Sequence, residues 1–242
     1  LTFTTNSTPA QQTGTSGPTL LTYNELVALY ETEPPSQDLS NKLTRLLTTP
    51  FVNNAAGSRP AKIIKTSLSS RGSSLRLATW NIERGLEFEA VKAALTNNQR
   101  FFRRLTPAMR GSKFNLANVL EQAAELSRAD IVVLNEVDWG LKRTDYRNVA
   151  RELATAMQMN YVFAAEFVEV DPLTLGTETL EGESSPDKAK MIENLAVDKT
   201  RTLGLHGTAI LSRLPLRNSR VVRFVNQGHD WYADEKDGVS KL

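Results

Sequence analysis

The stretch that decides the fold class is Ile131-Val132-Val133-Leu134-Asn135-Glu136-Val137-Asp138. Its first four residues form an unbroken apolar run, which is typical of a strand that is buried on both faces of a sheet. Polar and acidic residues follow the run at once. The pattern therefore predicts a buried strand over residues 131–134 that ends in amide and carboxylate groups.

Strand-like and helix-like segments alternate on both sides of this stretch. Residues 115–127 carry apolar side chains at the 3.6-residue period of an amphipathic helix. The same reasoning predicts a helix over 146–157 and strands over 75–80, 161–167, 206–212 and 219–225, with a polar, acidic surface loop over 171–202. This alternation predicts the α/β class.

The residues before this region differ in composition. Residues 1–20 are rich in Thr, Ser, Gln, Gly and Pro and are predicted to be a flexible lead. Residues 21–52 predict a helical extension, because Thr22 and Glu25 have the spacing of a capping box and four leucines follow on one helical face. Residues 53–74 are predicted to be a linker, and residues 75–242 the main domain.

Composition excludes several classes of function. The chain has 242 residues with 40% hydrophobic content, which suffices for a sizeable core. No apolar run reaches the roughly 18 residues of a membrane span. A net charge of +2 does not by itself indicate nucleic acid binding. The absence of cysteine excludes disulfides and thiolate sites, and two histidines disfavour a His-rich zinc site.

Two predicted strands end in side chains that suit a metal and phosphate site. Asn81 follows the strand over 75–80, and Glu136 follows the strand over 131–134. Ligands bind at strand ends in α/β sheets, and a carboxylate there can hold a hard divalent cation. A nearby amide can bind phosphate or orient the carboxylate. The alternative is that these residues only cap a helix or solvate a turn.

Three motifs, in order, carry a resemblance to a known family. Thr79-Trp80-Asn81-Ile82 resembles a T-W-N motif, and Val133-Leu134-Asn135-Glu136-Val137 resembles an L-Q-E motif in which Asn135 replaces Gln. The third segment, His206-Gly207-Thr208-Ala209-Ile210-Leu211-Ser212-Arg213-Leu214-Pro215, is similar to G-x-A-I-L-S-R-x-P. Residues 75–225 thereby resemble the endonuclease/exonuclease/phosphatase superfamily of deoxyribonuclease-like phosphoesterases.

The resemblance implies a fold, an activity and a site. The implied fold is a two-sheet α/β sandwich flanked by helices, of which this chain would hold the first half. The implied activity is hydrolysis of a phosphoester with Mg²⁺, or Mn²⁺, in a nucleic acid, a phosphorylated small molecule or a lipid headgroup. Glu136 would be the carboxylate ligand of the metal, and Asn81 would support the metal and the phosphate.

Other residues are candidates with a structural alternative. His206 could reach phosphate from its strand end, or have a purely structural role. Arg143 and Asn148 could contact substrate phosphate, although Thr144 or Asp145 in the same loop could instead simply cap the next helix.

Two further features have a structural reading that we favour. Glu83 and Asp138 are expected to be solvated turn residues. The run Arg100-Phe101-Phe102-Arg103-Arg104 mixes cations and aromatics as nucleic-acid surfaces do, but an amphipathic helix face is the favoured interpretation.

The downstream motifs of the family are missing. Asp230, Asp234 and Asp237 stand in neither a D-x-N nor an S-D-H sequence. We therefore expect the chain to be a truncated part of the domain that hydrolyses little or nothing by itself. The alternative to an enzyme is a binding module on the same fold. If the D-x-N and S-D-H motifs were also absent from a complete reading frame, that would favour the binding module. The Thr/Ser-rich lead and the lack of cysteine favour an exported protein.

Overall fold

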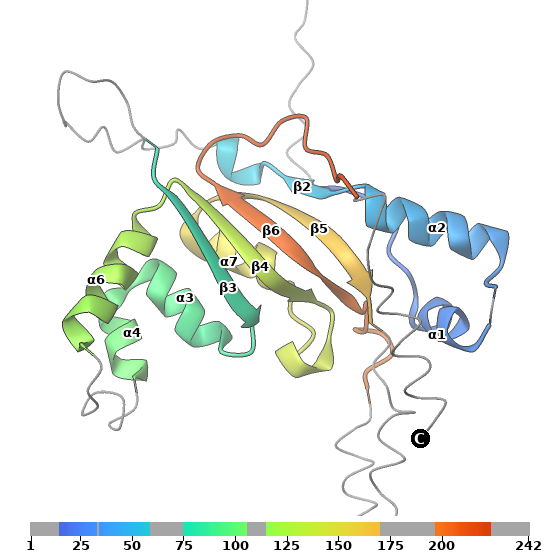
Figure 1. Ribbon diagram of the computed structural model, residues 1–242, viewed down its shortest axis with the longest axis horizontal. Coiled ribbons are helices and arrows are strands. Elements are labelled where there is room, and N and C mark those ends of the chain that lie inside the picture. Colours follow the sequence, from blue (N-terminus) through green and yellow to red (C-terminus); the bar gives the residue numbers. More distant parts are fainter. Residues whose placement is uncertain (1–14, 33, 59–74, 106–114, 170–196, 224–242) are drawn as a thin grey trace, which may run out of the picture.

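The computed structural model describes residues 15–32, 34–58, 75–105, 115–169 and 197–223. Within these ranges the strands form one six-stranded sheet in the order β1-β2-β5-β6-β4-β3 (Figure 1). The strands are β1 Thr15–Ser16, β2 Phe51–Asn53, β3 Leu77–Arg84, β4 Ile131–Trp139, β5 Asn160–Val168 and β6 Leu205–Ser212. The sheet and its helices confirm the predicted α/β class.

The sheet is mixed, and its one parallel pair matters most for the site. β3 runs parallel to β4. The other neighbouring strands are antiparallel: β4 pairs with β6, β6 with β5, β5 with β2, and β2 with β1. The carboxyl ends of β3 and β4 therefore meet at the same edge of the sheet. Both strands are irregular there: the β3–β4 register shifts between Asn81 and Arg84, and the β4–β6 register between Leu134 and Val137.

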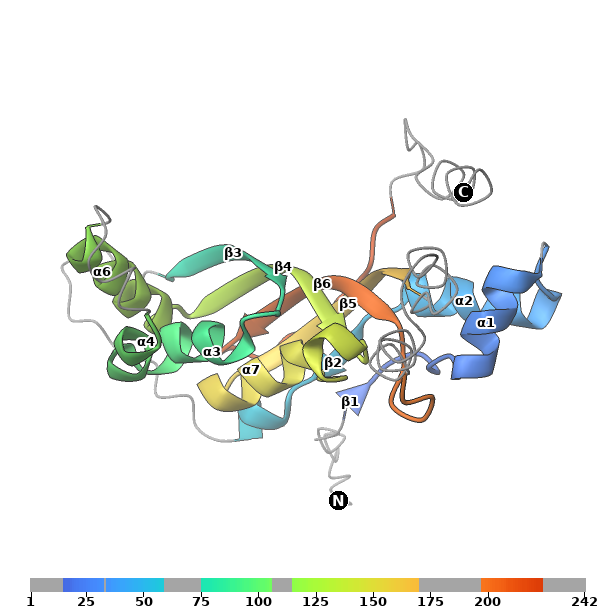
Figure 2. The same cartoon turned by 90° about the horizontal axis from the view of Figure 1, so that it is seen from below.

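Helices lie against one face of the sheet and at its two ends. Their bounds are α1 Tyr23–Glu31, α2 Gln37–Thr48, α3 Phe88–Thr96, α4 Asn98–Arg104, α6 Leu116–Ser127 and α7 Val149–Met157, with 3₁₀ turns η1 Ala55–Ser58 and η2 Lys142–Thr144. Figure 2 shows α3 and α7 in a layer below the sheet, with α4 and α6 at one end and α1 and α2 at the other. Among the described residues, no helix has the length and apolar character needed to cross a bilayer.

The first N-terminal helix begins as the sequence predicts. Thr22 Oγ1 accepts a hydrogen bond from the Glu25 backbone N–H at 3.3 Å, and Glu25 Oε2 accepts one from the Thr22 N–H at 2.7 Å, which completes the capping box. In α2 the buried residues are Leu39 and Leu46. Both belong to the same hydrophobic core as the central strands β4 and β6.

Strands and core residues come from both sides of the predicted domain boundary at residue 75. β2 pairs with β5, and Phe51 packs edge-on against Trp139 with ring centroids 4.8 Å apart. Phe163 lies beside both rings and is fully buried. Aromatic clusters of this kind contribute strongly to a core. The helical extension and the linker stay predictions, with residues 1–14 and 59–74 outside the described residues.

One predicted strand is wrong in its described part. Residues 219–223 form no strand, and Val222 is 80% exposed, so no burial stabilises an extended pairing there. Residues 224–225 lie outside the described residues, as do residues 170–196 of the predicted acidic loop. The helix expected from residue 146 begins later, at Val149, because Asp145 and Tyr146 have left-handed backbones. Asn148, not Thr144 or Asp145, caps it.

Candidate functional site

Asn81 and Glu136 meet at the ends of two neighbouring parallel strands. Asn81 Nδ2 donates a hydrogen bond of 2.6 Å to Glu136 Oε1. The Asn81 side chain is exposed and Glu136 is half-buried, so neither is sealed inside the apolar core. The structure thus brings together the two residues on which the predicted site depends. Their roles in binding a metal and phosphate stay predictions.

The backbone at Glu136 is unusual and sets the direction of its carboxylate. Glu136 has a φ of 53°, in the left-handed region that few residues other than glycine adopt. It lies inside the irregularity of β4 between Leu134 and Val137. A bulge of this kind re-aims a side chain, and a left-handed residue costs about 1 to 3 kcal/mol unless its surroundings hold it. The neighbouring strand has the same feature, since Glu83 and Arg84 have φ values of 49° and 64°.

The Asn81 amide is held at both of its ends. Besides the bond to Glu136, Asn81 Oδ1 accepts a hydrogen bond of 3.0 Å from the Glu83 backbone N–H, as in an Asx turn. Because the oxygen accepts and the nitrogen donates, the network assigns the orientation of the amide. Glu83 itself is exposed, as expected for a solvated turn residue.

The donor groups at this edge fit a hard divalent cation. Mg²⁺ usually binds through one or two carboxylates and keeps several waters, so a single half-buried carboxylate beside an amide is compatible with it. In the ranges that the structure describes, no three His, Cys, Asp or Glu side chains gather closely enough to form a metal cluster. A cation at Glu136 would therefore be held in an open site with few protein ligands.

A buried charged network lies directly beyond Glu136. Asp138 has no solvent exposure, so the expectation of a solvated turn is wrong. The reason is that β4 continues to Trp139 and its register pairs Asp138 with His206 of β6. Arg143 Nε donates to Asp138 Oδ2 at 2.7 Å and Nη2 donates to Oδ1 at 3.1 Å, while His206 Nδ1 lies 2.8 Å from the same Oδ1.

Arg143 is shared between two carboxylates. It also donates from Nη1 to Glu169 Oε1 at 2.6 Å and from Nη2 to Oε2 at 2.7 Å. Burial by itself would lower the pKa of the guanidinium, but the hydrogen bonds to Asp138 and Glu169 raise it above its usual value. Arg143 therefore stays charged. A substrate phosphate at Arg143 would have to compete with both carboxylates, and that contact stays a prediction.

His206 and Asn148 have environments that suit a structural role. His206 is buried between Asp138 and the Phe167 ring, which is stacked on it with centroids 4.7 Å apart. Asn148 is also buried, and its Oδ1 accepts a hydrogen bond of 2.9 Å from the Arg151 N–H at the start of α7. The structure does not join either of them by a hydrogen bond to Asn81 or Glu136 among the described residues. Their predicted phosphate contacts remain untested.

Sequence reasoning named Arg143, His206 and Asp138 but did not predict that they interact, nor that Glu169 joins them. The spacing of two residues between Glu136 and Asp138 was a usable signal, because alternate residues of a strand share a face. Glu169 gave no such signal, since it follows β5 and is 26 residues from Arg143.

Comparison with known proteins identifies one family. Residues 78–241, more than half of the chain, match the family described as Endonuclease/Exonuclease/phosphatase family. The matched span contains Asn81, Glu136 and the whole of β4 and β6. No curated protein and no solved structure gives a significant match.

Proposed function

Because this chain belongs to the Endonuclease/Exonuclease/phosphatase family, whose members generally act on phosphoester bonds, we propose that it is a Mg²⁺- or Mn²⁺-dependent phosphoester hydrolase with its metal at Glu136 and Asn81. The observation that carries the proposal is the hydrogen bond of 2.6 Å between Asn81 Nδ2 and Glu136 Oε1. It fixes a carboxylate at a sheet edge where ligands of α/β proteins bind.

Each residue has a defined task in this proposal. Glu136 supplies the negative charge that holds the cation, and Asn81 holds the carboxylate in one orientation by donating to Oε1. When bound, the metal supplies charge stabilisation for the phosphate and the leaving oxygen. Asn81 is itself held in place, because the Glu83 backbone N–H donates a hydrogen bond to Asn81 Oδ1.

The strained backbone favours an enzyme over a non-catalytic binding module on the same fold. Left-handed residues other than glycine cluster at functional sites because the fold must hold them against their intrinsic preference. Glu136, Glu83 and Arg84 form such a cluster around the proposed metal ligand. A module that binds only through its surface has no need of a strained carboxylate there.

The proposal is tested by metal binding and by hydrolysis. Calorimetry with Mg²⁺ should show binding to the unaltered protein and at least about tenfold weaker binding to Glu136→Gln, which keeps the size of the side chain but removes its charge. Hydrolysis of bis-p-nitrophenyl phosphate by the full-length protein should need Mg²⁺ and be lost in the same variant.

A matched control is Glu125→Gln, which removes an exposed carboxylate from α6. It should bind Mg²⁺ and turn over substrate like the unaltered protein. Equal Mg²⁺ affinity in Glu136→Gln and Glu125→Gln would contradict the proposed site, and absence of turnover from the full-length protein would favour the binding module.

A further inference from the structure

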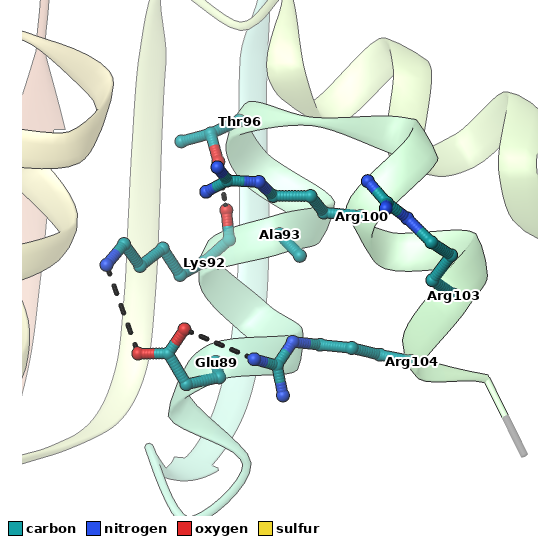
Figure 3. A pocket seen from close by; sticks show the side chains of 7 residues that line it. All are labelled: Glu89, Lys92, Ala93, Thr96, Arg100, Arg103 and Arg104. Atoms are coloured by element: carbon teal, nitrogen blue, oxygen red, sulfur yellow. Dashed lines mark hydrogen bonds and ion pairs between the residues drawn. The ribbon is translucent and has the colours of Figure 1, made fainter.

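We propose that the groove between α3 and α4 binds the phosphate backbone of a nucleic acid strand. The groove has a volume of about 370 Å³ and lies on the surface at the β3 end of the sheet (Figures 1 and 3). Its charged lining consists of four cations and one anion, namely Lys92, Arg100, Arg103, Arg104 and Glu89. We call it the α3–α4 groove.

The local sequence explains why the cations gather there. Asn97 ends α3 and begins α4, and its Oδ1 accepts a hydrogen bond of 2.9 Å from the Arg100 N–H. The turn at Asn97 sets the two helices side by side. Within α4, Arg100, Arg103 and Arg104 follow an i, i+3, i+4 spacing, which puts them on one helical face. Figure 3 shows this face turned toward α3.

The cations are weakly engaged within the protein. Glu89 lies 3.4 Å from Arg104 and 3.9 Å from Lys92, and all three side chains are well exposed. Exposed ion pairs of this kind contribute little to stability, so a phosphate could displace Glu89. Within the described residues, Arg100 and Arg103 form no ion pair. The amphipathic interpretation favoured for residues 100–104 stays a prediction, because α4, which contains them, buries none of its residues.

Nucleic acid fits this surface better than a membrane does. The apolar residues Ala93, Ala94 and Leu95 of α3 are buried, so they present nothing that would insert into lipid. The cations are spread over two helices, which suits an anion with repeated phosphates.

The α3–α4 groove adjoins a second groove of about 310 Å³. The second groove is lined by residues 85–89 and by the loop that carries Arg143 and Arg147. The two grooves share Glu89. Residues 85–87 directly follow β3, the strand that carries Asn81. The position of the scissile phosphate at Glu136 rests on the proposed function. Binding of a strand in the α3–α4 groove does not depend on catalysis and can be tested separately.

The test measures binding separately from hydrolysis. Fluorescence anisotropy would follow a fluorescein-labelled single-stranded oligonucleotide without Mg²⁺, in a Glu136→Gln background that prevents cleavage. Adding Arg100→Gln and Arg103→Gln should weaken binding at least about tenfold and lower the slope of log K against log salt by about two, one for each lost phosphate contact. Adding Glu89→Gln should strengthen binding, because it removes the competing carboxylate.

Arg45→Gln is the matched control, since Arg45 is an exposed helical arginine on α2 at the far end of the molecule. The Arg100→Gln/Arg103→Gln variant should bind the oligonucleotide more weakly than the Arg45→Gln control does, and circular dichroism should show that all variants are folded. Equal oligonucleotide affinity of the double variant and the control would overturn the proposal that the α3–α4 groove binds nucleic acid. The proposal would also be overturned if the double variant lost binding to phosphatidylserine vesicles but kept its oligonucleotide binding. Retained hydrolysis of bis-p-nitrophenyl phosphate by Arg100→Gln/Arg103→Gln made with Glu136 unaltered would leave the proposed function intact.

Discussion

Asn81 donates a hydrogen bond of 2.6 Å to Glu136, although the strand register sets Asn81 opposite Asn135. The bond forms because the bulge in β4 gives Glu136 a left-handed backbone and turns its carboxylate toward β3. Position along the strand and direction of the side chain are thus set by different features. The parallel pairing brings the two strand ends together, and the bulge aims the ligand.

The first prediction concerns Asn81→Ala. The substitution keeps the charge of Glu136 but removes the group that orients its carboxylate, so Mg²⁺ affinity should fall by about tenfold or more while the thermal midpoint changes little. Calorimetry measures the affinity. Asn41→Ala, which removes an exposed amide from α2, should leave it unchanged. Unaltered affinity in Asn81→Ala would mean that the hydrogen bond does not position the ligand.

The second prediction concerns the buried Asp138. In Asp138→Asn the negative charge that faces Arg143 and His206 is lost. The amide NH₂ group also replaces one carboxylate oxygen and faces groups that donated hydrogen bonds to that carboxylate. Breaking a buried pair costs about 3 to 5 kcal/mol in the free energy of unfolding. Urea denaturation measures it. Asp38→Asn, at an exposed position of α2, should cost less than about 1 kcal/mol. Similar costs for both variants would show that the network contributes little.

The sequence predicts the meeting of Asn81 and Glu136 because each directly follows an apolar strand, and neighbouring parallel strands end at one edge. It does not predict the environment of Asp138. The apolar run ends at Leu134, yet β4 continues to Trp139 because β6 pairs with it, and that partner is distant in sequence. A polar residue at a strand end looks solvated unless its partners are known. The pairing of β2 with β5 was missed for the same reason.

The third prediction concerns pH and the Glu25–Lys42 pair. Lys42 Nζ donates to both carboxylate oxygens of Glu25, at 2.8 and 2.7 Å, and this hydrogen bond lowers the pKa of Glu25, with a further contribution from Thr22. A lowered pKa in the folded state contributes stability above the pKa of the unfolded chain, and that stability is lost as pH falls through the folded value.

Lys42→Gln should therefore reduce the loss of stability on acidification. The free energy of unfolding, measured in urea at about pH 7 and at about pH 3.5, should fall less in Lys42→Gln than in the unaltered protein. Arg45→Gln on the same helix controls for the change in net charge and should follow the unaltered protein. An identical pH dependence in both variants would contradict the coupling of Glu25 to Lys42.

The last prediction concerns Gly207 in the central strand β6. This glycine has neighbours on both sides, since β6 pairs with β4 and with β5. A methyl group added at Gly207 would collide with the backbone carbonyl oxygen of Ala164, which belongs to β5 and cannot rotate away as a side chain could. Glycine is thus required at this position of the H-G-T-A segment because two strands approach closely there, and not because of an unusual φ.

Gly207→Ala should destabilise the protein by about 1 to 3 kcal/mol, because the crowded strands must shift to admit the methyl group. Urea denaturation with an unchanged m-value would identify the effect as a loss of stability. Thr79→Ala, at an exposed position of β3, should change the free energy of unfolding by less than about 0.5 kcal/mol. A Gly207→Ala protein as stable as the Thr79→Ala control would mean that β5 and β6 can separate at this point without cost. The close packing of β5 against β6 would then not be what requires glycine at this position.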